Sequence, residues 1–176
     1  MNPDPAPCTT QKLLAQLDAL GIEYKTYHHQ RIFTVKQAQE AQKTMPNIMP
    51  GGHSKNLFVR NKKGQMWLYS CLDDKKIDLK KLGKRLDAGR LSFGSPERLM
   101  THLGVIPGAV TPFALINDPD NQVKLVLDAD LMDQSPVNFH PLDNSMTTAL
   151  NPQDLYRFLD HIDHNYKVER FDFMNE

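Results

Sequence analysis

Several features that mark common protein classes are scarce or missing in this sequence of 176 residues. Its two cysteines, Cys8 and Cys71, are too few for a disulfide framework and lack the spacing of metal ligands. No run of about 18 apolar residues is present, and the first residues lack the basic and then apolar pattern of a signal peptide. These absences argue against a disulfide-stapled secreted domain and a membrane-spanning helix, and we expect a cytoplasmic protein without a metal or another cofactor.

The sequence also lacks a G-x-x-x-x-G-K-[ST] loop, which argues against nucleotide hydrolysis. Its formal net charge is 0, so the overall charge does not indicate nucleic acid. The sum hides an asymmetry, because residues 55–90 hold eleven Lys or Arg against four Asp or Glu, and residues 117–176 hold four against twelve. A local positive field of this kind can attract a polyanion.

The spacing of apolar residues and breakers predicts helices interspersed with short strands. Helices are predicted over 10–20, 34–43, 78–86, 95–103 and 151–162. Strands are predicted over 23–27, 54–60, 65–71, 91–93, 113–116, 122–127, 137–139, 147–150 and 166–173. Because strands pair as hairpins across 61–64 and 117–121, without a repeated βαβ unit, we predict a mixed α/β sheet. Residues 1–9 are predicted to be a disordered leader, and residues 10–176 a single domain.

One stretch brings a cation to the edge of a predicted core strand. It reads Gly51-Gly52-His53-Ser54-Lys55-Asn56-Leu57-Phe58-Val59. The two glycines permit positive φ or a close approach to a ligand, and the last three residues indicate a buried strand. In a regular strand Lys55 and Asn56 point to opposite faces, so a shared site requires irregular backbone or a main-chain contact from one of them. By itself, the stretch also fits a surface lysine after an ordinary turn.

Other candidate sites have weaker support. His161 and His164 are three residues apart near a helix end but lack a third ligand, so we interpret them as surface histidines. A Ser54–Lys55 hydrolase pair is disfavoured because adjacent strand residues diverge. Met45 and Met49, in the loop over 44–52, are gap-filling core residues or line a small apolar pocket.

Four motifs, in order along the chain, carry a family resemblance. They are Lys55-Asn56-Leu57-Phe58, then 89–97 around Phe93, then 104–115 with Pro107-Gly108 and Thr111, and finally 138–142 around His140. This set resembles the YbaK and prolyl-tRNA synthetase-associated editing domains, and within them the free-standing alanyl-tRNA(Pro) deacylases of the ProXp-ala type. The resemblance implies a curved or barrel-like, mostly antiparallel sheet of six or seven strands with helices packed outside.

The same resemblance implies hydrolysis of the ester that joins a mischarged amino acid, most simply alanine, to tRNA(Pro). It assigns Lys55, Asn56 and His140 to catalysis. Substrate binding is assigned to Gly108, Pro107, Met49, Phe93 and Thr111. None of the motifs offers an Asp, Glu or Cys nucleophile, so we expect attack by water, aided by electrostatics and the vicinal hydroxyl of the substrate.

The partner implied is the acceptor end of tRNA, and prolyl-tRNA synthetase is a possible second partner. Three alternatives stay open at this stage: a deacylase for cysteine or serine, a non-catalytic module that binds the tRNA end, and a structural or interaction domain. Scattered aromatic residues, one Trp and five Tyr, count against a stacking platform for single-stranded RNA.

Overall fold

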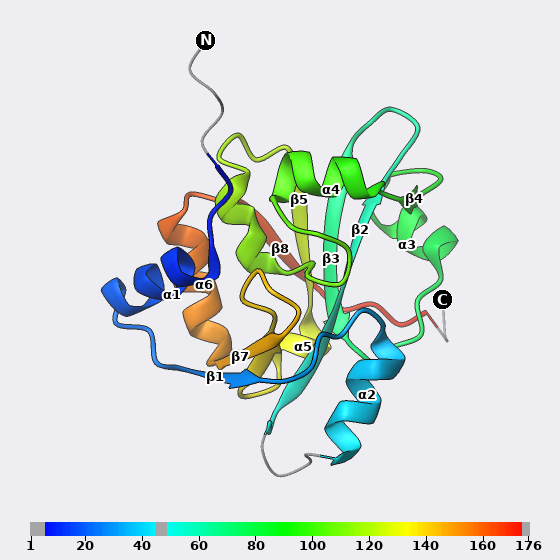
Figure 1. The fold of residues 1–176 in the computed structure, drawn as a ribbon. Helices are drawn as coiled ribbons and strands as arrows, with labels where there is room; N and C mark the ends of the chain where they lie inside the picture. Colours follow the sequence, from blue (N-terminus) through cyan, green and yellow to red (C-terminus); the bar gives the residue numbers. More distant parts are fainter. Residues whose placement is uncertain (1–5, 45–48, 174–176) are drawn as a thin grey trace.

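The structure, a computed structural model, describes residues 6–44 and 49–173, and at its centre is one eight-stranded sheet (Figure 1). Its strands are neighbours in the order β1-β7-β6-β2-β3-β5-β8, with β4 paired to β2. They are β1 Tyr24–His28, β2 Gly52–Arg60, β3 Met66–Leu72, β4 Ser92–Phe93, β5 Val123–Asp128, β6 Val137–Phe139, β7 Met146–Leu150 and β8 Tyr166–Glu169. The longest, β2, lies in the middle of the order and contacts three other strands.

The strand pairing confirms a mixed and mostly antiparallel sheet. Four pairs are antiparallel, β1–β7, β6–β7, β2–β3 and β2–β4. Three are parallel, β2–β6, β3–β5 and β5–β8. In the described residues β1 and β8 end the order without pairing to each other, so the sheet is not a closed barrel, and it has one or two strands more than expected.

The predicted hairpin across 117–121 is wrong. Its first arm is not a strand but a 3₁₀ helix, η1 Pro112–Asn117, with Pro112 at its start and the Thr111 hydroxyl accepting from the Phe113 amide. Phe113, Ala114 and Leu115 are all buried, so the run shows neither clear strand alternation nor a long helical period. As a result β5 pairs in parallel with β3 and with β8.

Short-range signals place most helices correctly. The helices are α1 Thr10–Ala19, α2 Val35–Thr44, α3 Leu79–Arg85, α4 Pro96–Leu103, α5 Ala129–Met132 and α6 Pro152–His161. Asp78, Ser95 and Asn151 accept hydrogen bonds from first-turn amides of their helices, as predicted. Thr34 and Gln37 form the predicted reciprocal capping box at the start of α2. The four-residue α5, capped by Asp128, was not predicted.

Alternate residues of the central strands enter two apolar cores, one on each face of the sheet. Leu68 packs in the larger core with residues of α1, α4, η1 and α6. Its neighbours Trp67 and Tyr69 face the smaller core, where α3 contributes Leu82. The strand β8 is shorter than predicted, and the chain after it places Phe171 and Phe173 in this smaller core. Figure 1 accordingly shows α1 and α6 on one side of β3 and β5 and α3 on the other.

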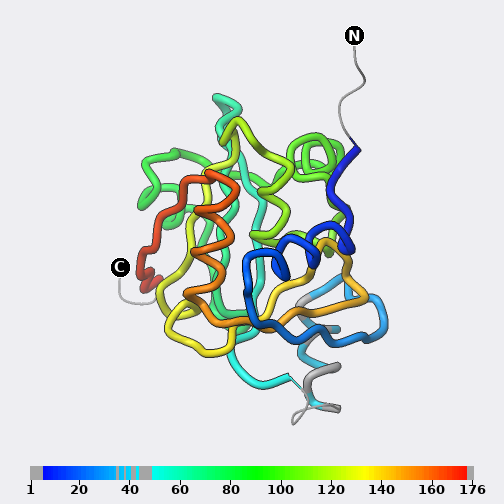
Figure 2. The backbone as a smooth tube through the Cα atoms, turned by 90° about the vertical axis from the view of Figure 1, so that its left-hand side faces the viewer, coloured from blue at the N-terminus to red at the C-terminus, as the bar shows by residue number. Residues whose placement is uncertain are grey.

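Figure 2 shows the coil of α1 beside that of α6, with the chain before α1 running toward the top of the view. The Cys8 amide donates to Asn117 Oδ1 at 2.8 Å, and Thr9 caps α1. Residues 1–5 of the predicted leader lie outside the described residues, so their disorder stays a prediction. In the part of the chain that is described, every helix is too short or too polar to cross a bilayer.

Candidate functional site

The site lies beside β2, along the edge of this strand that pairs with β6 at one end and with β4 at the other. This strand pairs with β6 at Gly52 and His53 and with β4 at Val59 and Arg60. Between these two ladders, one edge of β2 has no strand partner in the described residues. Gly51 has φ +94°, and a Cβ atom there would lie 2.0 Å from the Pro136 carbonyl oxygen. The glycine pair is therefore required for the close contact of β2 with β6, as its permissive backbone suggested.

A cavity of about 180 Å³ opens along this free edge. It is lined by Ile32, Phe33, Thr34, Ser54, Lys55, Asn56, Gly108, Val110 and His140. Four segments that are distant in the sequence thus converge, and they include both catalytic candidates of β2. Lys55 and Asn56 both line this cavity, although β2 is a continuous strand and their side chains point to opposite faces of it. This is possible because the cavity lies along the unpaired edge of the strand, which borders both faces.

The Lys55 ammonium is held by backbone carbonyls of the turn that follows β3. Its Nζ donates to the carbonyl oxygen of Asp73 at 3.1 Å and to that of Lys75. An ammonium group has three donors, so one N–H remains for a further acceptor, although neither Asp73 nor Lys75 belongs to the cavity lining. The turn itself is anchored, since Lys75 Nζ lies 2.8 Å from Asp128 Oδ2 and 2.8 Å from Asp130 Oδ2. A point charge in a fixed place suits a phosphate or the oxygens of an ester.

Asn56 supplies an acceptor that the described residues leave unpaired. Its Nδ2 donates to Ser54 Oγ at 3.3 Å, and that hydroxyl donates to the Asn138 carbonyl at 2.8 Å. Its Oδ1 is buried and has no hydrogen-bond partner among the described residues. Because a buried unpaired acceptor is costly, this atom calls for a donor such as a water, a hydroxyl or an ammonium group.

His140 follows β6 and presents a neutral imidazole. Its Nδ1 lies 2.6 Å from the Met146 carbonyl oxygen, which can only accept, so Nδ1 carries the proton and Nε2 is the acceptor. Burial lowers the pKa of His140 below its ordinary value of 6.5, and the nearby His29 ring acts in the same direction. The Met146 bond and Asp143 oppose this shift less strongly. The site therefore contains a base that stays unprotonated near neutral pH.

The far wall of the cavity is the predicted turn at Pro107-Gly108. The Ala109 amide donates to the Ile106 carbonyl at 3.0 Å, and Gly108 has φ +90°, which agrees with a type II turn. A Cβ atom at Gly108 would lie 3.1 Å from the Ile32 carbonyl oxygen and 3.3 Å from Phe33 Cα. The absence of a side chain therefore lets the 32–34 segment lie against this turn.

Gly108→Ala is expected to lower stability and, with it, the deacylation that the resemblance of the sequence motifs implies. A non-glycine residue at this φ costs about 1–2 kcal/mol, and the contact with Ile32 adds to that cost. Urea unfolding measures the first effect and hydrolysis of an aminoacyl-tRNA the second. The matched control is Gly64→Ala, because Gly64 has φ +82° with no atom within 4 Å of its Cβ position. Equal losses in both variants would show that crowding at Gly108 is unimportant.

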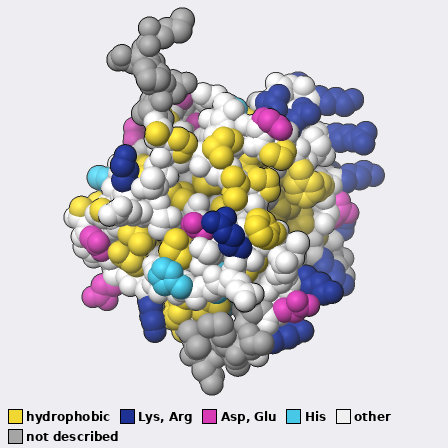
Figure 3. Space-filling model, viewed as in Figure 1, with side chains coloured by type: hydrophobic (Ala, Val, Ile, Leu, Met, Phe, Trp, Pro, Cys, Tyr) yellow, Lys and Arg dark blue, Asp and Glu magenta, His cyan; other side chains and the backbone are white. Residues whose placement is uncertain are grey.

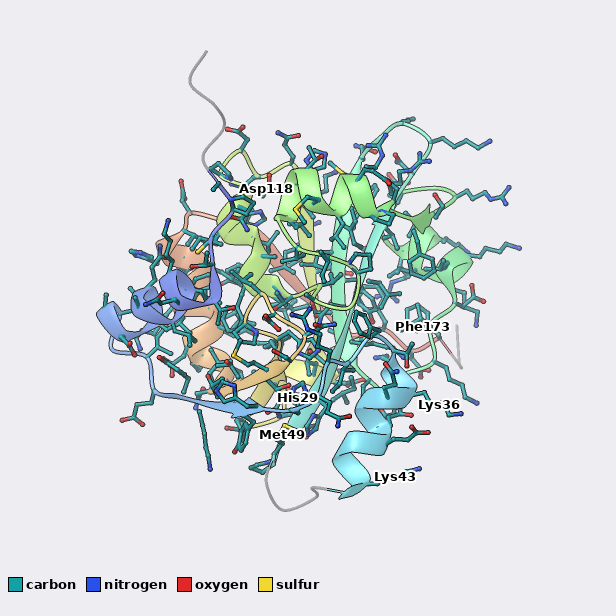
Figure 4. The ribbon with its side chains drawn as sticks, viewed as in Figure 1. His29, Lys36, Lys43, Met49, Asp118 and Phe173 are labelled. Atoms are coloured by element: carbon teal, nitrogen blue, oxygen red, sulfur yellow. The ribbon has the colours of Figure 1, made fainter. Side chains whose placement is uncertain are left out.

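A second, smaller hollow of about 40 Å³ adjoins the cavity and shares Ile32, Ser54 and His140 with it. Its other lining residues are Met49, His53, Asp73, Asn138, Phe139 and Thr147. Met49 is buried and packs with Tyr27 and Ala149, and Figure 4 shows it at the same end of the molecule as His29. Met45, the other methionine of this loop, lies outside the described residues.

The structure places three other candidate residues away from these hollows. Pro107 belongs to the turn but is absent from the cavity lining, and Phe93 is 63% exposed on β4. Thr111 is fully buried, where it caps η1. The sequence reasoning missed Ile32, Phe33, Thr34 and Val110 as lining residues, and none of them carries a local signal of a site.

The alternative chemistries have little structural support. Ser54 Oγ and Lys55 Nζ donate to different carbonyl groups, so the described residues show no Ser–Lys hydrogen bond. The described residues also contain no group of three or more His, Cys, Asp or Glu placed to hold a metal. The interpretation of His164 as a surface residue is wrong. It is buried, and its Nε2 lies 3.2 Å from Asp118 Oδ2.

Comparisons with known proteins agree on one family. Residues 29–158 match the family model for the aminoacyl-tRNA editing domain. The prolyl-tRNA editing protein ProX of Acetoanaerobium sticklandii is 36% identical over 150 residues, covering 85% of this chain and 89% of the relative. The prolyl-tRNA synthetase associated domain-containing protein 1 of Bos taurus is 36% identical over 164 residues, covering 89% and 92%.

A solved structure shows the same fold. The crystal structure of a proposed trans-editing enzyme for prolyl-tRNA synthetase superimposes with a TM-score of 0.65 at 20% identity, covering 95% of this chain and all of the other. The resemblance found in the sequence motifs is thereby confirmed. The chain belongs to the aminoacyl-tRNA editing domain family.

Proposed function

We propose that this protein is a trans-editing deacylase that hydrolyses the ester of mischarged tRNA(Pro), with alanine as the amino acid removed. The observation that carries the proposal is the convergence of Lys55, Asn56, Gly108 and His140 on one small cavity. Membership of the editing family and the relative named as a prolyl-tRNA editing protein support the reaction class.

The chemistry follows from the donors and acceptors in the cavity. Lys55 offers one free N–H and a positive charge to the terminal phosphate or to the ester oxygens. The described lining residues include no Asp, Glu or Cys, and the hydroxyls of Ser54 and Thr34 are engaged by the backbone, so we take water as the attacking group. Neutral His140 accepts a proton or a hydrogen bond at Nε2 from that water or from the vicinal hydroxyl of the ribose.

Size explains the choice of amino acid. A synthetase pocket built for proline rejects a smaller residue poorly, because a missing methylene changes binding by only about 1–3 kcal/mol. A second site that admits only small residues corrects this error. The hollow of about 40 Å³ beside the cavity offers room for a methyl group but little more. We infer that the alanine side chain enters this hollow and that the proline ring is excluded from it.

The charge distribution offers a surface for the tRNA. Figure 3 shows Lys and Arg gathered along one side of the molecule, over the β2–β3 connection and α3. Lys36 and Lys43 project outward from α2 in Figure 4. Contacts between Lys or Arg side chains and tRNA phosphates weaken as the salt concentration rises. The affinity for tRNA is therefore expected to fall with salt concentration. Direct contact with prolyl-tRNA synthetase and a cytoplasmic location stay predictions.

The decisive experiment measures release of labelled amino acid from aminoacyl-tRNA. Ala-tRNA(Pro) is expected to lose alanine many times faster than Pro-tRNA(Pro) loses proline. Ser-tRNA(Pro) and Cys-tRNA(Pro) test the neighbouring amino acids, and Ala-tRNA(Ala) tests selection of the tRNA. Faster release of serine or cysteine would change the assigned amino acid. If none of these substrates is hydrolysed, the proposed reaction is wrong, and tRNA binding at low salt then separates a binding module from a structural domain.

The pH dependence of hydrolysis tests the role of His140. Its pKa is lowered in the folded protein, so the ring stays neutral, and able to accept a proton, as the pH falls to 6.5 and somewhat below. The acid limb of the rate profile is therefore expected below pH 6.5, after subtraction of the uncatalysed ester hydrolysis. His140→Ala should lack this limb and be slower by about 10²–10⁴-fold. An acid limb above pH 6.5 would contradict a neutral base at this position.

A further inference from the structure

The cavity is too small for the whole end of the substrate. Sites that enclose drug-sized ligands measure about 300–1,000 Å³, and an aminoacylated adenosine is a ligand of that size. The cavity of about 180 Å³ and its neighbour of about 40 Å³ can take the amino acid and the ester but not the nucleoside as well. The terminal base must therefore lie outside, against the rim.

Phe33 lies on that rim. It lines the cavity with Lys55 and His140, yet 55% of its surface is exposed. An exposed aromatic side chain beside a polar recess presents a flat face on which a base can stack. Phe93 is more exposed, but it belongs to β4 and does not line the cavity.

The backbone around Phe33 is fixed before any ligand arrives. The Phe33 amide donates to Gln37 Oε1 at 2.8 Å, as part of the capping of α2. On the other side, Ile32 is buried and exchanges two hydrogen bonds with Asn144, at 3.0 Å and 2.9 Å. An exposed ring on an anchored backbone loses little conformational freedom on binding, which favours a stacking role.

We propose that Phe33 stacks on the adenine base of the terminal nucleotide while the aminoacyl ester enters the cavity. This inference rests on the proposed function, because it takes the 3′ end of an aminoacyl-tRNA as the ligand. It assigns to Phe33 binding of the nucleoside, whereas Lys55, Asn56 and His140 act at the ester.

The test compares variants of Phe33 with and without an aromatic ring. Phe33→Leu keeps an apolar side chain without a ring, and Phe33→Tyr keeps the ring. With uncharged tRNA(Pro), Phe33→Leu is expected to raise Kd by about 5- to 150-fold, which is the loss of affinity that corresponds to one base–aromatic stacking contact. Phe33→Tyr is expected to change Kd little. In a tRNA ending in 2-aminopurine, binding to the wild-type protein should quench the fluorescence, and binding to Phe33→Leu should not.

Val168→Ala is the matched control, because Val168 is an exposed apolar residue of β8, 42% accessible and outside the cavity lining. Equal affinity and equal quenching in the wild-type, Phe33→Leu and Val168→Ala proteins would overturn the stacking role. Loss of affinity in Phe33→Leu without quenching in the wild-type protein would also overturn it, as it would show apolar packing alone. A wild-type protein that quenches the probe but hydrolyses no ester would refute the proposed reaction and leave the stacking in place.

Discussion

Lys55→Ala is expected to slow hydrolysis of Ala-tRNA(Pro) by about 10²–10³-fold, the usual cost of removing one donor that stabilises developing charge. The substitution removes the charge of a cavity-lining residue and the N–H group that its two carbonyl partners leave. The fold should persist, because Asp73 and Lys75 are both partly exposed and water can solvate their carbonyl groups. Single-turnover rates measure the chemical step, and circular dichroism and urea unfolding check the fold.

Lys12→Ala serves as the control for this variant, since Lys12 is an exposed lysine of α1 and is not a cavity residue. It removes the same charge from the molecule and is expected to retain wild-type activity. Lys55→Arg separates charge from shape, because a guanidinium keeps the charge but cannot make the same compact contacts with two carbonyls. Wild-type rates in Lys55→Ala would remove this residue from the mechanism.

Lys75→Met is expected to lower the free energy of unfolding by about 3–5 kcal/mol, because it leaves a buried carboxylate without its cation. The Asp128 side chain is fully buried, accepts from the Tyr69 hydroxyl and lies 2.8 Å from Lys75 Nζ. The same carboxylate caps α5 through the Asp130 amide. Urea unfolding monitored by the fluorescence of Trp67 provides the measurement.

Two further variants make the stability prediction specific. Lys75→Met combined with Asp128→Asn should recover part of the loss, since a neutral amide needs no cation, its oxygen can accept from the Asp130 amide and its NH2 can donate to the Tyr69 oxygen. Arg170→Ala removes an exposed partner of Asp130 and Asp133 and should cost no more than about 1 kcal/mol. Similar losses in Lys75→Met and Arg170→Ala would mean that burial does not strengthen the Lys75 pair.

Local chemistry explains why much of the fold could be predicted from the sequence. The Thr34–Gln37 box, the Ser95-Pro96 helix start and the Pro107-Gly108 turn depend on residues within four positions of one another. The β2–β3 hairpin follows from two apolar runs around 61–64. These local signals do not depend on tertiary contacts, so they can be recognised in the sequence alone.

The errors arise where tertiary contacts decide. The apolar run 113–116 suits a strand or a buried helical turn, and in the structure it forms the latter, with Phe113 packed against Phe139 and Phe158. His164 is buried by a pairing with Asp118, which is 46 positions away in the sequence. Nothing near either residue in the sequence announces that contact.

The candidate site was predictable only in part. Lys55, Asn56, Gly108 and His140 belong to motifs of the family, and the structure brings all four to one cavity. Ile32, Phe33 and Val110 complete its walls, but an apolar residue in a cavity wall resembles an apolar residue of the core in sequence. The placement of Met49 in a separate, smaller hollow likewise depends on how β6 and β7 lie beside the start of β2.

The cavity is lined by one central strand and by segments that are distant from it in the sequence. Its parts can therefore be altered separately. Lys55 belongs to β2, and the pairing of β2 with β3 and β6 fixes the register of this strand. The Asp73 carbonyl accepts a hydrogen bond from the Lys55 ammonium group. The opposing walls belong to the loops around residues 32–34 and 108–110, which an engineer can exchange without disturbing that anchor. Exchanges in these loops that keep Ile32 should therefore alter binding of the terminal nucleotide at Phe33, while selectivity for the amino acid, which we assign to the smaller hollow, should be retained.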